Sequence, residues 1–227
     1  MAGVATSLLG ISLLAGSKLG RLSSAARDNP FLLWNTVLAL VPLGLAGLLF
    51  RDHVRTSAGW WAGLVAWLLF LPNAPYVLTD SVHLLDDIRT SSNWTVYFGL
   101  LPVYGAFFVV GFTSYVLCMR MLRRFLLTRV VGARVVRIEF AVHALCAVGM
   151  YLGRFVRLNS WDVVAAPATV TATLDDLARR FPLAIMLMTF VLLTVGTFSV
   201  NAVIDAGTEA GARVVASIGR ATPRKRA

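Results

Sequence analysis

Charged residues, and acidic residues above all, are scarce in this sequence. Asp, Glu, Lys and Arg make up 14% of the 227 residues, with only 11 acidic side chains, whereas 58% are hydrophobic and the mean hydropathy is +0.75. This composition lies well outside that of soluble globular domains and predicts an all-α integral membrane protein. Because a spanning helix needs roughly 20 apolar residues, we expect one membrane domain with about six spans and short loops.

Cysteine is nearly absent, and so are the motifs of common enzymes. The two cysteines, Cys118 and Cys146, lie inside apolar runs, so neither a disulfide framework nor a cysteine metal site is indicated. The sequence has no phosphate-binding loop, dinucleotide-binding glycine pattern, His-Glu-x-x-His or Cys-x-x-Cys. It therefore assigns no metal and leaves any cofactor unknown. The net charge of +10 does not indicate nucleic acid, because the basic residues fall between apolar runs, where they face anionic lipid.

Apolar runs predict the spans of this bundle. They lie at residues 30–50, 57–79, 94–119, 135–153 and 182–204, followed by a basic tail at 205–227. A further run at residues 1–17 is followed, not preceded, by positive charge, so it is either a retained first helix or a segment in the membrane plane.

The third span is expected to be broken at Pro72 and Pro75. Its first part, from Ser57 to Leu71, gives a helix of about 22 Å, which is shorter than the hydrocarbon core of about 30 Å. Proline disfavours a helix that continues through it. The sequence therefore predicts a helix that ends inside the outer leaflet.

Two basic segments orient the chain. The first follows the fourth span and the second is the tail, and both are expected in the cytoplasm under the positive-inside rule. The first comprises Arg120, Arg123, Arg124, Arg129, Arg134 and Arg137. The loops at residues 80–89 and 154–180 are then expected outside, and the C-terminus inside.

A first polar motif follows the break. Asn73 can cap a new helix that has Pro75 in its first turn. On that helix four polar side chains are spaced to share one face: Tyr76, Asp80, His83 and Asp87. They fit either a carboxylate and histidine site capable of proton transfer or weak metal binding, or a solvated helix whose polar face meets water or arginines.

A second polar motif lies near the outer end of the fifth span. Tyr151, Arg154 and Arg157 follow at three-residue spacing, and Asn159, Trp161 and Asp162 come just beyond. Arginines at this depth are costly and usually paired. One interpretation is an ion-pair clasp with Asp80, Asp87 or Asp162. The other is a site where arginines and the start of the helix after Asn73 bind phosphate or carboxylate.

The fifth span also carries Glu139 and His143 one helical turn apart. We expect Glu139 to pair with an arginine of the basic block, such as Arg134 or Arg137, or with one on another helix.

The two polar motifs carry a family resemblance. The stretches at residues 71–84 and 151–162 together resemble the signature of a bacterial membrane family catalogued as domain of unknown function 1361. The resemblance extends from about Asn35 to Asn201. It implies a multi-pass inner-membrane protein without an assigned activity, and it supplies no catalytic residue.

Three functions follow as hypotheses. The first is the binding or transport of an anionic, lipid-phosphate-like ligand at the outer leaflet, with both motifs as the site. The second is a membrane-embedded transferase or hydrolase that uses Asp80 and His83 for acid-base chemistry. The third is a non-catalytic assembly or scaffold protein.

Overall fold

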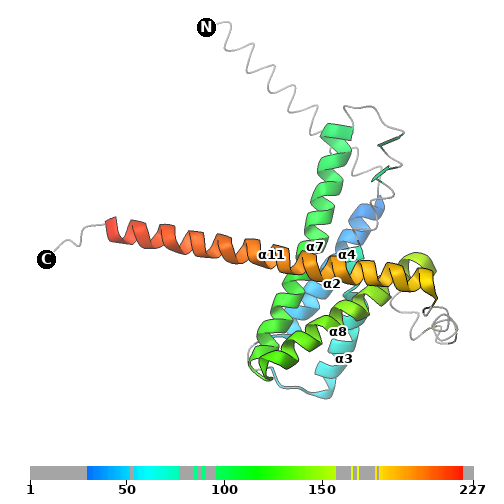
Figure 1. Ribbon diagram of the computed structural model, residues 1–227, viewed down its shortest axis with the longest axis horizontal. Helices are drawn as coiled ribbons and strands as arrows, with labels where there is room; N and C mark the ends of the chain where they lie inside the picture. The colour runs from blue at the N-terminus through cyan, green and yellow to red at the C-terminus, as the bar shows by residue number, and fades with distance from the viewer. Residues whose placement is uncertain are drawn as a thin grey trace, which may run out of the picture.

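The computed structural model describes residues 30–51, 54–76, 84–85, 88–89, 96–156, 165, 168, 177 and 179–221, and this part of the chain is helical almost throughout (Figure 1). Its main helices are α2 (Pro30–Leu49), α3 (Ala58–Phe70), α4 (Asn73–Tyr76), α7 (Leu101–Leu127), α8 (Gly132–Tyr151) and α11 (Arg180–Ala221). Two π-helical turns, η2 (Val96–Leu100) and η3 (Leu152–Val156), precede α7 and follow α8. The predicted all-α class is confirmed for these residues.

Helices α2 and α7 lie side by side, with α3, α4 and α8 gathered around them (Figure 1). Helix α11 packs mainly on α8 and also touches α7, and its C-terminal part projects beyond the bundle. Helix α11 therefore crosses the other helices on one side of the bundle.

Three segments are long and apolar enough to cross a membrane: Val96–Leu127, Gly132–Val156 and Arg180–Arg213. Trp34–Leu49 is a shorter apolar helix. Large hydrophobic side chains are exposed on α11, as at Met188 and Val203, and lipid is their natural environment. These helices support a multi-pass membrane protein, whereas the described residues do not reach the predicted count of about six spans. Residues 1–17 lie outside the description.

Two helices continue past their predicted ends. Helix α7 does not stop at Met119 but runs on to Leu127, because Leu122 and Phe125 extend its buried face while arginine, a good helix former, occupies exposed positions. Helix α11 passes the predicted boundary at residue 204 and ends at Ala221, with Glu209 and Arg213 paired one turn apart at 3.3 Å.

Aromatic side chains hold the α2–α3 connection against the end of α7. Phe50 meets Trp67 edge to face at 5.0 Å and lies 5.4 Å from Phe125, measured between ring centroids. Trp60 stacks on Phe125 at 5.6 Å, and its Nε1 donates to the carbonyl of Leu49 at 3.0 Å. Since lipid is as apolar as these rings, packing and hydrogen bonding, and not escape from water, hold such helices together.

A second apolar cluster lies nearer the start of α7. It is formed by Ala39, Val96, Leu100, Tyr104 and Phe107. About two turns beyond Phe107 on α7, the hydroxyl of Ser114 donates to the carbonyl of Ala39 at 2.7 Å, and both residues are buried. This bond joins α2 to α7 where water cannot compete for either group.

The third predicted span does break at Pro72. Helix α3 begins after Ser57, whose side-chain oxygen accepts from the N–H of Trp60, and it ends at Phe70 with Leu71 as C-cap. Its 13 residues span about 20 Å, too short for the hydrocarbon core. The prediction of a short helix ending at the prolines is confirmed to within one residue at each end.

Candidate functional site

The backbone N–H groups of the turn at Pro72 donate to carbonyls of the same turn. The N–H of Ala74 donates to the carbonyl of Leu71, and the N–H of Tyr76 donates to the carbonyl of Pro72, each at 3.1 Å. The side-chain Nδ2 of Asn73 donates to the carbonyl of Phe70 at 3.0 Å, so this amide helps to close α3. We expected the start of the helix after Asn73 to offer N–H groups to an anion. That expectation is wrong for Ala74 and Tyr76, because both N–H groups are engaged within the turn.

Pro72 packs closely against α8. An ideal Cβ placed on Gly149 would lie 2.6 Å from Cγ of Pro72 and 3.1 Å from its Cβ, so only glycine permits this approach. Gly149 is five residues before Arg154. The contact therefore brings the beginning of the first polar motif next to the helix that carries the second.

Aromatic contacts fix the end of α8. Tyr151 stacks on Phe155 at 5.1 Å, and Phe155 meets Phe181 of α11 edge to face at 6.2 Å. Arg154 immediately precedes Phe155 in the π-helical turn η3 and is half-buried. The π-helical turn changes the register of the side chains at this point, and such turns are frequent at functional sites.

Most residues of the two predicted motifs lie outside the described part of the chain. These are Asp80, His83 and Asp87 of the first motif and Arg157, Asn159, Trp161 and Asp162 of the second. Tyr76, at the end of α4, is described and half-buried. Whether the acidic stripe and the arginines form a clasp or a pocket stays a prediction.

The third predicted constellation is fully described. Oε2 of Glu139 accepts from Nη1 of Arg123 at 2.7 Å, and the Glu139 side chain is only 13% exposed. The prediction that Glu139 pairs with an arginine is confirmed, and the partner belongs to α7. The pair ties α8 to α7 close to the turn that joins them.

Arg120 makes the equivalent connection from α7 to α11. Its guanidinium donates to Oδ1 of Asn201 at 2.9 Å and to Oδ1 of Asp205 at 2.8 Å. The arginine is largely buried, while Asp205 is largely exposed. A planar guanidinium can serve both acceptors on one helix face at once, which a lysine ammonium does less well.

His143 is buried and bonded to a tyrosine. Its Nδ1 lies 2.6 Å from the phenol oxygen of Tyr115 on α7, and the two side chains are 4% and 0% exposed. A polar pair at this depth needs such mutual satisfaction. The two cysteines, Cys118 and Cys146, are buried free thiols in the same apolar cluster.

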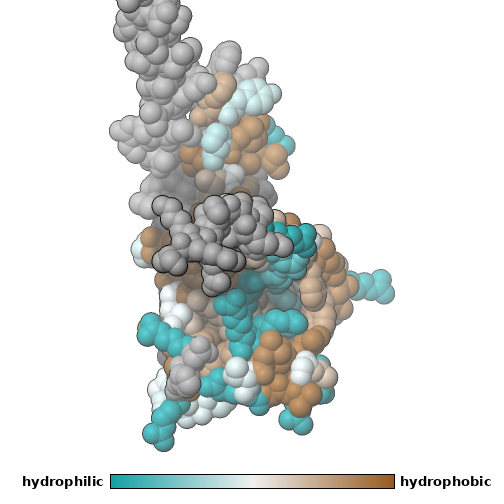
Figure 2. All heavy atoms as spheres, turned by 90° about the vertical axis from the view of Figure 1, so that its left-hand side faces the viewer, coloured by the Kyte–Doolittle hydropathy of each residue, from teal (hydrophilic) through white to brown (hydrophobic). Residues whose placement is uncertain are grey.

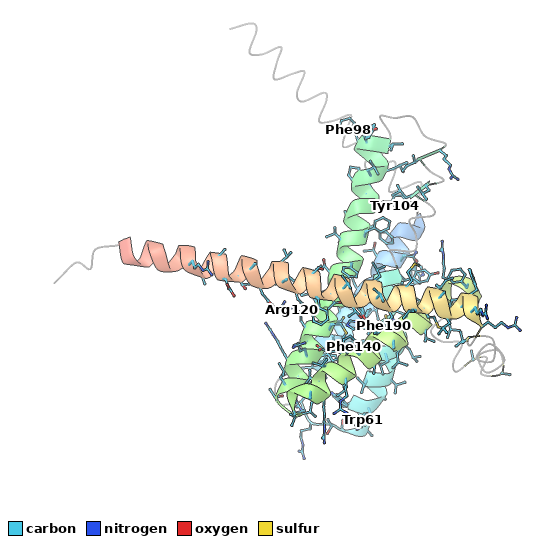
Figure 3. The ribbon with its side chains drawn as sticks, in the orientation of Figure 1. Trp61, Phe98, Tyr104, Arg120, Phe140 and Phe190 are labelled. Atoms are coloured by element: carbon cyan, nitrogen blue, oxygen red, sulfur yellow. The ribbon has the colours of Figure 1, made fainter. Side chains whose placement is uncertain are left out.

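Arg120, Arg123, Glu139 and His143 line a narrow cleft between α7, α8 and α11. Its volume is about 20 Å³, room for about one water molecule. It is lined by Met119, Arg120, Arg123, Val136, Glu139, Phe140, His143, Thr197, Phe198 and Asn201. In Figure 3 the labelled Arg120, Phe140 and Phe190 lie where α11 crosses the bundle. Figure 2, viewed from the C-terminal side of α11, shows hydrophilic residues gathered in the lower half of that face.

Sequence reasoning found Glu139 and His143 but missed Tyr115, Arg120, Thr197 and Asn201. Helix α11 carries polar residues at helical spacing within an apolar run: Thr194, Thr197, Asn201 and Asp205. This polar stripe is the sequence pattern that could have indicated a polar face on α11. Among the residues that the structure describes, no three His, Cys, Asp or Glu side chains group as a metal site.

Comparison with known proteins adds a family and no activity. A family model described as a protein of unknown function (DUF1361) matches residues 34–195. No curated protein matches the chain. No solved structure matches it either.

Proposed function

Since the chain belongs to this family of unknown function, the family supplies no activity, and we propose that the protein binds or transports an anionic, lipid-phosphate-like ligand at the outer leaflet of a bacterial inner membrane. The ligand site would lie between the Pro72 turn and the segment that follows Tyr151. The supporting observation is the contact of Pro72 with Gly149, which puts the turn that begins the first motif against the helix that leads into the second.

The orientation rests on the basic end of the bundle. The α7–α8 turn carries the first basic segment, and it meets the connection between α2 and α3, since Nη2 of Arg129 donates to the carbonyl of Val54 at 3.2 Å. Positive charge favours the cytoplasmic side. The Pro72 turn and the end of α8 are reached by following α3 and α8 away from that side, so they would face the outer leaflet.

The chemistry would come from arginine. Arg154, half-buried beside the aromatic contacts of Tyr151 and Phe155, and Arg157, three residues on, would offer guanidinium forks to a phosphate or carboxylate. Because the N–H groups of Ala74 and Tyr76 are used within the turn, the arginines and not the helix start would carry the affinity.

Reconstituted protein with Arg154→Ala and Arg157→Ala tests this function. The affinity of the reconstituted protein for anionic phospholipid in its own bilayer is expected to be lower in both variants than in the wild type. Arg154→Lys, which keeps the charge and loses the fork, should fall between wild type and alanine. Arg213→Ala is the matched control, because Arg213 is 81% exposed on the projecting part of α11. Unchanged binding in both alanine variants, or an equal loss in the control, would refute the proposal.

A further inference from the structure

The α7/α8/α11 cleft contains a polar chain that becomes steadily more buried. Arg123 is 45% exposed at the mouth, its partner Glu139 is 13% exposed, and His143 one turn further along α8 is 4% exposed. Behind His143 the chain ends at Tyr115, which is fully buried. Ionisable side chains inside a membrane bundle are expensive, and they commonly mark proton or ion pathways.

The geometry of His143 leaves one ring nitrogen for the cleft. Nδ1 is engaged by the phenol oxygen of Tyr115, and His143 lines the cleft together with Glu139. A group that enters the cleft can therefore reach His143 only through Nε2 among the two ring nitrogens. The bond at one nitrogen sets the role of the other.

Thr197 on α11 faces the same space with an unused hydroxyl. The residue is 6% exposed, and its Oγ1 has no hydrogen-bond partner among the described residues. A buried hydroxyl without a partner is unfavourable unless water satisfies it. The cleft volume of about 20 Å³ suits about one water molecule.

Among the residues that the structure describes, the charges around the cleft are balanced, which argues against an anion as its ligand. The cations that face it are Arg120 and Arg123 of α7. Arg123 is paired with Glu139 of α8, and Arg120 with Asp205 of α11. The remaining polar groups that line the cleft on α11 are Thr197 and Asn201. A neutral cleft with a histidine, a carboxylate and a free hydroxyl suits water and protons.

We propose that the cleft is a hydrated proton-exchange site, in which a water held by the hydroxyl of Thr197 passes protons between the mouth at Glu139 and Nε2 of His143. When Nδ1–H donates to the phenol oxygen of Tyr115, Nε2 carries the lone pair. A proton from the water then binds at Nε2, and the water takes a replacement proton from solvent at the mouth. The imidazolium that forms adds one positive charge, since Glu139 is already paired with Arg123, and it is neutral again once the water takes the proton back.

This site is independent of the anion site at Pro72. The two share no residue, and they lie toward opposite ends of α8. Failure of either proposal leaves the other standing.

Solid-state NMR of the full chain in lipid bilayers, with ¹⁵N-labelled histidine, tests the proposal. The sequence has three histidines, so substitution of His53 and His83 by glutamine assigns the signal of His143. Magnetisation transfer from water to the ring and exchange of the ring N–H in deuterium oxide are the two measurements. In wild type, we expect His143 to receive magnetisation from water and to exchange.

Thr197→Val removes the hydroxyl at nearly constant volume and is expected to slow both processes several-fold. Thr197→Ser, which keeps the hydroxyl, should behave as wild type. Thr194→Val is the matched control, because Oγ1 of Thr194 is also buried and without a partner among the described residues, while Thr194 does not line the cleft. Protection of His143 from water in the wild type would overturn the proposal, whatever the stability of the variants. Equal slowing in the Thr194 and Thr197 variants would also overturn it.

Discussion

Gly149 of α8 lies directly against the ring of Pro72, at a distance that leaves no room for a side chain on the glycine. Pro72 follows the end of α3, as expected of a residue that disfavours helix continuation, and the break would leave a short helix end poorly packed within the bundle. The glycine lets α8 cover that end. The contact between these two residues therefore packs the end of the short helix α3 against α8.

Replacement of Gly149 by alanine should therefore destabilise the protein. The new Cβ would meet Cγ of Pro72 at 2.6 Å, and the proline ring is tied to the backbone, so α8 or the turn must move. We expect a loss of about 1–3 kcal/mol in the free energy of unfolding, as for other overpacked sites. Thermal denaturation in one detergent measures it.

Gly105→Ala is the control for that substitution. Gly105 lies in α7 with nothing within 4 Å of an ideal Cβ, so alanine should be neutral or stabilise the helix by up to about 1 kcal/mol. If both variants melt at the same temperature, the contact with Pro72 does not constrain the bundle.

The end of α3 at Pro72 was predictable from the sequence, whereas the contact of Pro72 with Gly149 was not. Pro72 disfavours a helix that continues through it, and Ser57 is a good N-cap, so the limits of α3 agree with local chemistry, although α2 does continue through Pro42. The four-residue spacing of Gly149 and Gly153 permits another helix to pack closely, but it does not predict which helix does so. Which surface meets a glycine depends on how helices far apart in sequence are arranged.

A second glycine contact allows a graded prediction. An ideal Cβ on Gly196 of α11 would lie 2.5 Å from Cζ of Phe112 on α7. Cζ is the far end of a rotatable side chain, so the ring can yield where Pro72 cannot. Gly196→Ala should cost about 1 kcal/mol, less than Gly149→Ala. Gly207→Ala, with nothing within 4 Å, is the control on the same helix. A larger loss at Gly196 than at Gly149 would contradict this ranking.

The Arg123–Glu139 pair should respond asymmetrically to substitution. Glu139 is 13% exposed and Arg123 is 45% exposed, so Arg123→Ala removes the partner of a mostly buried carboxylate. We expect this to cost about 1–3 kcal/mol. Glu139→Gln keeps an oxygen acceptor for the arginine and should cost less.

A double-mutant cycle measures the coupling of that pair. Arg123→Ala combined with Glu139→Gln should cost less than the sum of the two single losses, because the double variant has no buried unpaired charge. Strictly additive losses would mean that the 2.7 Å contact contributes no coupling.

The residues of the cleft were only partly predictable from the sequence. Glu139 and His143 could be placed on one face of α8 by spacing alone, and the pairing of Glu139 with an arginine followed from the cost of an unpaired carboxylate. Tyr115 precedes His143 by 28 residues, and Arg120 precedes Asn201 by 81. Helical periodicity describes one helix at a time, so it could not bring these residues together.

The hydrogen bond between Tyr115 and His143 should be among the most valuable polar contacts in the bundle. Tyr115→Phe removes the phenol oxygen 2.6 Å from Nδ1 and leaves that buried nitrogen without this partner, at an expected cost of about 1–3 kcal/mol. Ser114→Ala is a matched control, because it removes a neighbouring buried hydroxyl whose acceptor is a backbone carbonyl of α2. Interhelical bonds of that kind average about 0.6 kcal/mol in membrane proteins.

The same oxygen should become dispensable once the imidazole is gone. In a His143→Phe background, Tyr115→Phe should cost almost nothing beyond the first substitution, because no ring nitrogen remains to be satisfied. Denaturation of the four proteins in one detergent gives the coupling energy directly. If Tyr115→Phe costs the same in both backgrounds, the phenol oxygen stabilises the protein through a group other than His143, and the 2.6 Å contact is not what fixes His143 at the cleft.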